Sequence, residues 1–367
     1  MESELLVPMM FVSKASGTHV TLAGDHKQLG AIIRSRVADM YSFSRSTLER
    51  LLFSKDIREN HCVQLTDSYR AHPEILRLYN KMTYQDSLEA RGDTTHTGRL
   101  EGLTLFPVPE RPVAFYHVDG VEERQGDSPS WMNMLEAKAV VLLLHALFAA
   151  EQPTNNNDNK KKKKLAFEDV VVLSPYNKQI KEIGRIIHLQ FQQFANKKDS
   201  PWYCGGIKGG YDRRHPPIKV CSVEQFQGRE APVVVMSCVR SKKNDEINND
   251  LLQGIGFLKQ PKRLNVAISR PIAGLFIIGN VTVLQKDPNW STLIRLMAAD
   301  EEKESSVCTL PMGNVVAKRL CNADLDAMKQ QRNTADSNDR AVAAAAAQRG
   351  APPPPPPPSY NGNTTTI

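Results

Sequence analysis

Several features that would assign this chain to a familiar class are missing from its sequence. No apolar run approaches the ~20 residues that cross a bilayer, and the first residues have neither the basic segment nor the cleavage site of a signal peptide. The six cysteines show no C-x-x-C spacing, which argues against a zinc site or a redox pair. These absences predict a soluble protein with free thiols, in a reducing compartment and without a membrane partner.

The residues that are present can form a buried core. The chain has 367 residues, of which 41% are hydrophobic and 24% charged, enough for one or two domains. Lys and Arg number 47 against 40 Asp and Glu, a formal net charge of +7. This excess favours acidic partners such as nucleic acid, although many unrelated proteins share it.

Two segments carry too little apolar material to pack into a core. One is a low-complexity insertion at about 153–165 with a run of lysines, and the other is a tail with an alanine run and a proline run at 352–358. We expect both to be disordered, the proline run being extended. The lysine run is interpreted as a solvated loop, with a contact to RNA as the alternative.

Between these segments, β-branched runs alternate with amphipathic stretches. This alternation predicts an α/β fold in which helices cover both faces of a parallel sheet. Several of the predicted strands are apolar on both faces, as buried parallel strands are. The predicted strands read HVTLAG, PVAFYHV, DVVVLS, IKVCSV, APVVVMSCV and GLFIIG.

Two helices are predicted in more detail. One runs from Met134 to Ala150, because Asn133 can cap it and Glu136 lies at its third position. The next helix has apolar residues at helical spacing along one face. These residues are Ile180, Ile183, Ile187 and Phe191.

Five polar clusters lie beside the predicted strands. Ligands of open α/β sheets bind in loops at the carboxyl ends of the strands, so we expect these clusters to contain the functional residues. In chain order they read GDHKQLG (24–30), LTDSYRAHP (65–73), SPYNKQ (174–179), SVEQFQGRE (222–230) and KRLNVAISR (262–270).

Three of the clusters carry groups suited to a phosphate ligand. Gln28 can hydrogen-bond a γ-phosphate or an attacking water, although Gly-Asp is also an ordinary turn. Tyr69 can stack on a base while Arg70 clamps a phosphate, and a salt bridge beside a helix start is the alternative for this arginine. Arg270 follows a helix, from which an arginine can stabilise the charge that develops in nucleotide hydrolysis.

The other two clusters suit different roles. Residues 174–179 open a helix whose free N–H groups can hold a nucleic-acid phosphate, but helix capping explains them almost as well. Residues 222–230 place two amides, an aromatic ring, an arginine and two carboxylates between two buried strands. A turn that only needed to be soluble would not require this density, so function is favoured there.

These clusters resemble, in order, the later motifs of the superfamily 1 helicases related to the nonsense-mediated decay helicase. The sequence around these motifs, including GDSPSW and GFLKQPKRLNVA, is most similar to the Armitage, silencing-defective and Moloney leukaemia virus ten group of RNA helicases. The resemblance covers roughly Glu4 to Ala298. It implies a RecA-like fold and an ATP-dependent RNA helicase that uses ATP and Mg²⁺. It also implies a cytoplasmic location, including ribonucleoprotein granules, with factors of RNA silencing or decay as partners.

The resemblance also implies roles for individual residues. Gln28 would sense the γ-phosphate, and Arg70 and Arg270 would contact it from the second motor domain, so these three are the candidate catalytic residues. Tyr69 would stack near the adenine.

The remaining site residues follow from the same resemblance. Glu230 would meet the ribose, and Gly228 would allow the backbone to approach it closely. The side of the domain that faces single-stranded RNA would include Ser174, Pro175, Tyr176 and Ser222.

The chain also departs from the family pattern. The phosphate loop G-x-x-x-x-G-K-[ST] does not occur in it, and the acidic pair that should lie shortly before Glu4 is missing too. Arg270 is followed by Pro271 where relatives continue with a further basic residue, and Ala31 stands in the place of a proline. We therefore expect the magnesium ligands to lie outside this chain and the chain alone to be inactive.

The domain organisation follows from these motifs. Residues 1–60 would complete a first motor domain, residues 61–300 would form the second, and residues 301–367 would be the tail. ATP would bind between the two motor domains and RNA would cross their top, so hydrolysis would drive translocation. The alternatives are a non-catalytic RNA-binding or scaffold module derived from a helicase, and a truncated gene model.

Overall fold

The computed structural model describes residues 2–12, 19–31, 33, 35–124, 130–150, 165–203, 218–241, 256–298 and 307–309. Residues 153–164 of the predicted insertion lie outside the described residues. The same holds for the predicted tail, except for residues 307–309. The three residues 307–309 form a strand, so the sheet extends into the segment that the sequence assigns to the tail.

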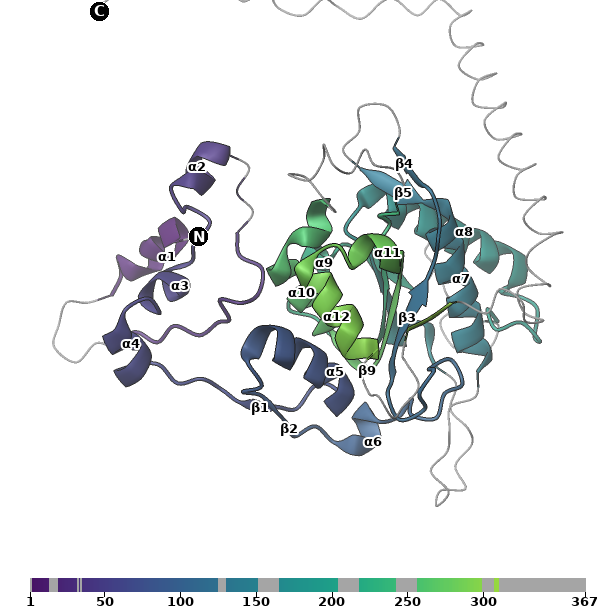
Figure 1. The fold of residues 1–367 in the computed structure, drawn as a ribbon, viewed down its shortest axis with the longest axis horizontal. Coiled ribbons are helices and arrows are strands. Elements are labelled where there is room, and N and C mark those ends of the chain that lie inside the picture. Colours follow the sequence, from purple (N-terminus) through teal and green to yellow (C-terminus); the bar gives the residue numbers. More distant parts are fainter. Residues whose placement is uncertain are drawn as a thin grey trace, which may run out of the picture. The chain divides into compact units, whose positions relative to one another are not determined.

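The described part of the chain is organised around one parallel sheet of six strands (Figure 1). Their order across the sheet is β10-β3-β9-β8-β6-β7, and every neighbouring pair is parallel. The strands are β3 (Val113–His117), β6 (Val170–Leu173), β7 (Lys219–Cys221), β8 (Ala231–Ser237), β9 (Pro271–Gly279) and β10 (Val307–Thr309).

Two small two-stranded sheets flank this one. In the first, β1 (Asp67–Ser68) pairs in parallel with β2 (Glu89–Ala90). In the second, β4 (Glu122–Arg124) and β5 (Trp131–Asn133) form an antiparallel hairpin.

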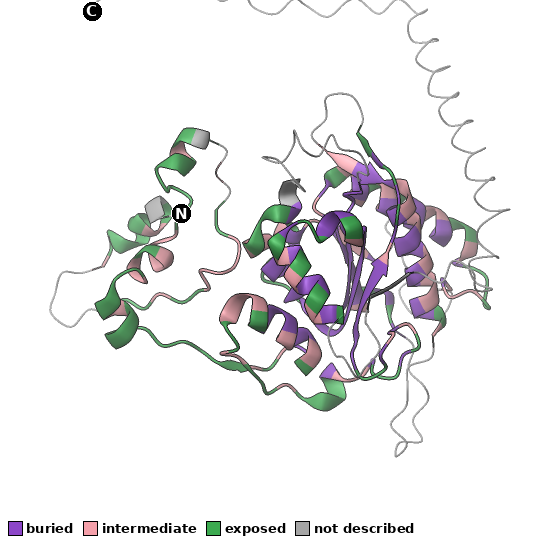
Figure 2. Ribbon diagram, viewed as in Figure 1, coloured by how far each residue is buried: buried purple, intermediate pink, exposed green. Residues whose placement is uncertain are grey.

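Each face of the main sheet has its own hydrophobic core. Successive strand residues point to opposite faces, so Val234 and Val235 of β8 belong to different cores. The first core includes residues of α5 (Pro73–Tyr79), α10 (Pro261–Ile268) and α12 (Pro288–Ala298). The second includes α7 (Met134–Ala149) and α8 (Asn177–Phe194). The burial in Figure 2 is concentrated in this layered part, which confirms the predicted α/β class with helices on both faces.

The start of α7 agrees with its prediction from the sequence. Asn133 caps the helix, its side chain accepting a hydrogen bond from the backbone N–H of Glu136 at 3.1 Å. In α8, Ile183, Ile187 and Phe191 are buried on the predicted face, and Ile180 is partly buried. Both predictions depended on local patterns, and both are confirmed.

The remaining helices are short. They are α6 (Thr94–Thr97), α9 (Val223–Phe226), α11 (Val281–Leu284), the π-helix η1 (Asn80–Tyr84), and the 3₁₀ helices η2 (Phe167–Asp169) and η4 (Gly256–Lys259). None of the helices in the described ranges is long and apolar enough to span a membrane.

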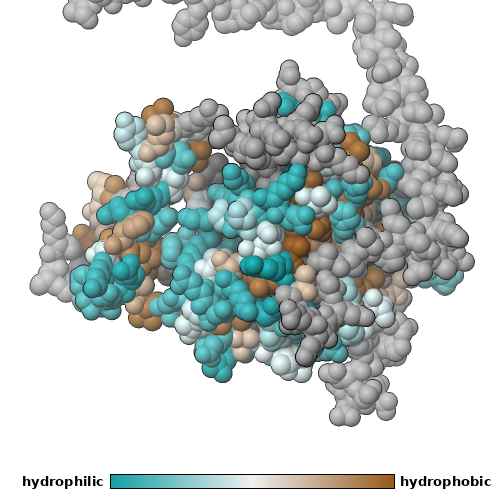
Figure 3. All heavy atoms as spheres, in the orientation of Figure 1, coloured by the Kyte–Doolittle hydropathy of each residue, from teal (hydrophilic) through white to brown (hydrophobic). Residues whose placement is uncertain are grey.

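The chain ahead of β1 forms four short helices. They are α1 (Glu2–Met9), α2 (Arg36–Met40), α3 (Thr47–Leu51) and α4 (Lys55–Asn60). The predicted strand HVTLAG is wrong, because residues 19–24 have no strand structure. A strand needs the backbone groups of a neighbour, and these residues pair with none of the described strands. Large apolar side chains such as Phe11, Met40 and Tyr41 are exposed here, and hydrophobic residues are visible on this region in Figure 3.

Candidate functional site

Arg270 lies between the end of α10 and the start of β9, at the amino end of the two central strands. It is only 2% exposed. Its Nε atom donates to the carbonyl of Val266 at 3.1 Å, and Nη1 donates to that of Arg229 at 3.2 Å. Nη2 lies 3.4 Å from Oε1 of Gln28. Burial and the nearby Arg70 lower the pKa of Arg270 below its usual value, but a guanidinium stays charged at physiological pH. The result is a fixed, buried cation beside Gln28.

A second guanidinium lies next to it. Arg70 follows β1, and its Nε atom is 2.6 Å from Oε2 of Glu230, with Nη1 3.5 Å from the carbonyl of Ser269. The backbone N–H of His72 donates to the carbonyl of Ile272 at 2.8 Å, which ties the YRAHP segment to the second residue of β9. This tie brings Arg70 to the residues that precede β9.

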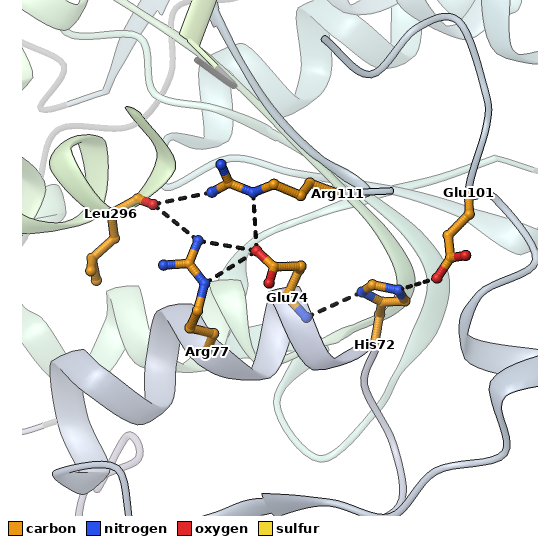
Figure 4. Close-up of polar contacts among 6 residues, drawn as sticks. All are labelled: His72, Glu74, Arg77, Glu101, Arg111 and Leu296. Atoms are coloured by element: carbon orange, nitrogen blue, oxygen red, sulfur yellow. Dashed lines mark hydrogen bonds and ion pairs between the residues drawn. The ribbon is translucent and has the colours of Figure 1, made fainter. Parts of the chain in front are cut away.

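A polar cluster fixes the helix that follows Arg70. It consists of His72, Glu74, Arg77, Glu101, Arg111 and Leu296 (Figure 4). Oε2 of Glu74 accepts from Nε of Arg77 at 3.1 Å and from Nε of Arg111 at 3.0 Å. Both arginines also donate to the carbonyl of Leu296, at 3.1 and 3.3 Å. The cluster therefore joins α5 to α12.

The imidazole of His72 caps α5. Its Nδ1 atom accepts from the backbone N–H of Glu74 at 3.2 Å, so the ring presents Nε2 to Oε1 of Glu101 at 2.6 Å. Because Nδ1 is the acceptor, Nε2 carries the proton and donates to the carboxylate. The residues YRAHP are thus a short segment whose proline starts the helix, whose histidine caps it and whose arginine points to Glu230.

Glu230 and Gly228 lie at the amino end of β8, after α9. Ser222 and Gln225 form a capping box at the start of that helix. Gly228 has φ +76°, and no heavy atom lies within 4 Å of the Cβ that another residue would have there. The backbone conformation, and not crowding, therefore requires glycine at this position.

The segment with Gln28 is held by polar contacts to later parts of the chain. Nε2 of Gln28 donates to Oδ2 of Asp25 at 2.9 Å, and that same oxygen accepts from the hydroxyl of Tyr84 at 2.5 Å. Nδ2 of Asn265 donates to the carbonyl of Lys27 at 3.0 Å. Gln28, Arg70, Glu230 and Arg270 come from four distant parts of the sequence, and these contacts bring them together.

Two of the residues in this arrangement had no assigned role in the sequence analysis. Asn265 belongs to the LNVAISR motif and is buried inside α10; an amide within an apolar run is the sequence signal that could have singled it out. Tyr84 lies on the π-helix η1, outside every motif. Burial and the hydrogen bond to Asp25 raise the pKa of Tyr84, so its hydroxyl remains a donor. Tyr69, by contrast, is 70% exposed.

The four residues predicted to face RNA lie at the opposite, carboxyl edge of the sheet. Ser174 is buried, and its backbone N–H donates to the carbonyl of Cys221 at 3.2 Å. Tyr176 is also buried and is hydrogen-bonded to Arg240, and burial raises the pKa of its hydroxyl. Pro175 and Ser222 are partly exposed, the latter as the cap of α9. Pro175 and Ser222 are therefore the more accessible members of this set, and Ser174 and Tyr176 are buried.

The donor set suits an anion better than a bare metal ion. Within the described ranges, no group of three or more His, Cys, Asp or Glu side chains is placed to hold a metal. Two guanidinium groups and one amide converge at the amino edge instead, and guanidinium groups match the geometry of phosphate oxygens.

Residues 43–282 match the family model described as an AAA domain. The chain belongs to this family, within the superfamily 1 helicases. This helicase-family chain is 29% identical over 352 residues to the putative helicase mov-10-B.1 of Danio rerio, covering 93% of the chain and 32% of the relative. It is 33% identical to the RNA helicase Mov10l1 of Homo sapiens, over 80% of the chain and 22% of the relative.

A third similarity is to the regulator of nonsense transcripts 1 homolog of Drosophila melanogaster. The identity is 32%, over 80% of this chain and 21% of that protein. The helicase-family chain thus spans less than a third of the length of these relatives. The comparisons confirm the family resemblance inferred from the motifs.

Proposed function

We propose that the chain provides the second-domain side of the ATP site of an RNA helicase, together with Gln28 from the end of the first motor domain. The observation that carries this proposal is the convergence of Arg70, Arg270 and Gln28 at the amino edge of β8 and β9. Two guanidinium groups and an amide are the groups that stabilise the charge of a transferring phosphoryl group. Gln28, Arg70 and Arg270 are accordingly proposed as the catalytic residues.

The other contacts to the nucleotide follow from the same assignment. The exposed ring of Tyr69 is proposed to stack on the adenine, and Glu230 to bind the ribose where Gly228 leaves the backbone open. Glu230 now neutralises Arg70, so nucleotide binding would exchange this ion pair for contacts to the ligand. The ligands of Mg²⁺ and the phosphate loop would come from another part of the helicase, because the sequence has no G-x-x-x-x-G-K-[ST].

Single-stranded RNA is proposed to bind at the carboxyl edge, along Ser174, Pro175, Tyr176 and Ser222. The net charge of +7 supports an electrostatic contribution, so affinity should fall as salt rises and counterions are released. The chain would then act in the cytoplasm with factors of RNA silencing or decay. Affinity that stays constant between low and high salt would contradict an electrostatic RNA face.

The catalytic proposal is tested with a fusion protein. A first motor domain that carries the phosphate loop is fused ahead of Met1, and RNA-stimulated ATP hydrolysis is measured. We expect background hydrolysis from the chain alone and RNA-stimulated turnover from the fusion. Arg270→Ala should lower kcat by about 10³-fold or more, the usual contribution of an arginine finger. Arg295→Ala, an exposed arginine on α12, is the matched control and should leave kcat unchanged.

Because Arg270 is buried, folding must be separated from catalysis. Arg270→Lys keeps the charge with fewer donors, and Arg70→Ala removes a partly exposed side chain; circular dichroism of each variant checks the fold. Folded variants that still turn over normally would defeat the assignment. A fusion that binds RNA but does not hydrolyse ATP would favour the alternative, a non-catalytic RNA-binding module.

A further inference from the structure

The β4–β5 hairpin presents an aromatic side chain near two guanidinium groups. Trp131 and Arg124 are directly opposite each other across the hairpin. The Cζ atom of Arg124 lies 5.8 Å from the centroid of the Trp131 ring, and that of Arg240 lies 5.3 Å from it. Both distances are those of cation–π contacts.

Trp131 differs from the other two tryptophans of the chain. Trp202 and Trp290 are both fully buried, in the second and the first core respectively. Trp131 is only partly buried and belongs to neither core. Neither of the two hydrophobic cores therefore contains Trp131.

The base of the hairpin is held rigidly to the loop that follows β8. Oε2 of Glu122 accepts from Nε of Arg240 at 2.9 Å and from the backbone N–H of Ser241 at 3.0 Å. Nδ2 of Asn133 donates to the carbonyl of Val239 at 3.2 Å. These contacts fix the backbone that carries Trp131. Binding of a ligand to the ring would therefore cost little entropy for ordering the hairpin.

The same contacts place Trp131 at the carboxyl edge of the sheet. Arg240 is hydrogen-bonded to Tyr176, and the backbone N–H of Lys178 donates to the hydroxyl of Ser130 at 2.9 Å. Trp131 therefore adjoins the loop that follows β6. Glu122 neutralises Arg240, whereas Arg124 is exposed and adds positive charge beside the ring.

We propose that Trp131 is a stacking platform for a base of single-stranded RNA, with Arg124 beside the adjacent phosphate. Bases of single strands stack on aromatic rings and guanidinium planes, while cations track the backbone. This inference rests on the proposed function, because it adds a contact to the RNA face at the carboxyl edge.

The test uses the full chain, a labelled adenosine 12-mer RNA and an abasic 12-mer of the same length. Anisotropy of the label measures affinity, and intrinsic tryptophan fluorescence reports on Trp131, since the other two tryptophans are buried. We expect the adenosine 12-mer to quench the fluorescence. Trp131→Ala should weaken its binding by about 5- to 150-fold, which corresponds to roughly 1–3 kcal/mol for one stacked base. Trp131→Tyr should retain most of the affinity.

The abasic 12-mer separates stacking from a structural role of the side chain. It should bind wild type and Trp131→Ala equally and should not quench the fluorescence. Equal losses of affinity for both oligomers in Trp131→Ala would overturn the inference, because they would indicate a disturbed hairpin. Normal RNA binding without quenching would overturn the inference alone, whereas no RNA binding by the wild type would overturn the proposed RNA face as well.

Discussion

The Nε atom of Arg70 lies 2.6 Å from Oε2 of Glu230, although 160 positions separate the two residues. The side chains are 38% and 52% exposed. Ion pairs with this exposure contribute little to stability, because water screens the charges and two long side chains must be ordered. The pair can therefore be opened at low cost, as an exchange with a nucleotide would require.

The first prediction concerns this ion pair. Glu230→Gln removes the charge and keeps the shape of the side chain, so the free energy of unfolding should change by less than about 1 kcal/mol. Urea denaturation measures it. A loss above about 2 kcal/mol would mean that the pair is structural, which would speak against the proposed exchange.

The second prediction concerns Glu136, which is buried at the start of α7. Burial raises the pKa of this carboxyl group to about 8, despite hydrogen bonds from Val239 and Ser237, and the charge of Glu122 adds to the effect. The folded state therefore binds the proton more tightly than the unfolded state. The stability that this group provides is complete below its ordinary pKa of 4.5 and is lost as pH rises to about 8.

Glu136→Gln resembles the protonated side chain and has no such pH dependence. The free energy of unfolding of Glu136→Gln should increase relative to that of the wild type as pH rises from 5 to 8. The increase should be at most about 1.4 kcal/mol per pH unit. Urea denaturation at pH 5, 6.5 and 8 measures the difference, in which contributions of groups common to both proteins cancel. A constant difference would show that Glu136 is ionised in the folded protein.

The third prediction compares two glycines. A Cβ at Gly120 would lie 2.3 Å from Oδ1 of Asn133, whose side chain is held by its own hydrogen bonds. Gly120→Ala should therefore destabilise the protein by about 1–3 kcal/mol. Gly184 lies inside α8 with no atom within 4 Å of its Cβ position, so Gly184→Ala should stabilise it by about 0.5–1 kcal/mol. Thermal unfolding should shift in opposite directions; shifts of the same sign would contradict the explanation.

The fourth prediction concerns the cluster that joins α5 to α12. The Arg111 side chain is 4% exposed and Glu74 is 28% exposed, so Glu74→Ala removes the carboxylate from a largely buried ion pair. We expect a loss of about 2–3 kcal/mol, below the ~3–5 kcal/mol of a fully buried pair. Glu182→Ala breaks the more exposed pair with Arg185 and should cost less than about 1 kcal/mol. Similar losses in the two variants, measured by urea denaturation, would refute the structural role of Glu74.

Local patterns in the sequence were sufficient to predict several elements. The cap at Asn133 and the apolar face of α8 depend on residues three or four positions apart, and both are present in the structure. The strand HVTLAG failed because strand formation depends on a neighbour that no local pattern reveals. The family was recognisable because its motifs occur in order.

The geometry of the site was harder to predict from the sequence than these local elements. Ligands are expected at the carboxyl ends of parallel strands, yet Glu230 and Arg270 precede β8 and β9 and lie at the amino edge. The pairing of Arg70 with Glu230 and the contact of Tyr84 with Asp25 depend on tertiary structure. The sequence identified residue types suited to phosphate but could not show which of them already bind one another.

Strand β8 begins directly after Glu230 and ends three residues before Arg240. Its seven residues span about 23 Å at roughly 3.3 Å per residue, and it is hydrogen-bonded to β6 on one side and β9 on the other. A strand that is hydrogen-bonded on both sides resists stretching and bending, so its two ends move together. A displacement of Glu230 along the strand axis would therefore be passed toward Arg240 and the Trp131 ring beside it, through the irregular pairing between Ala231 and Val233 and the left-handed Val239.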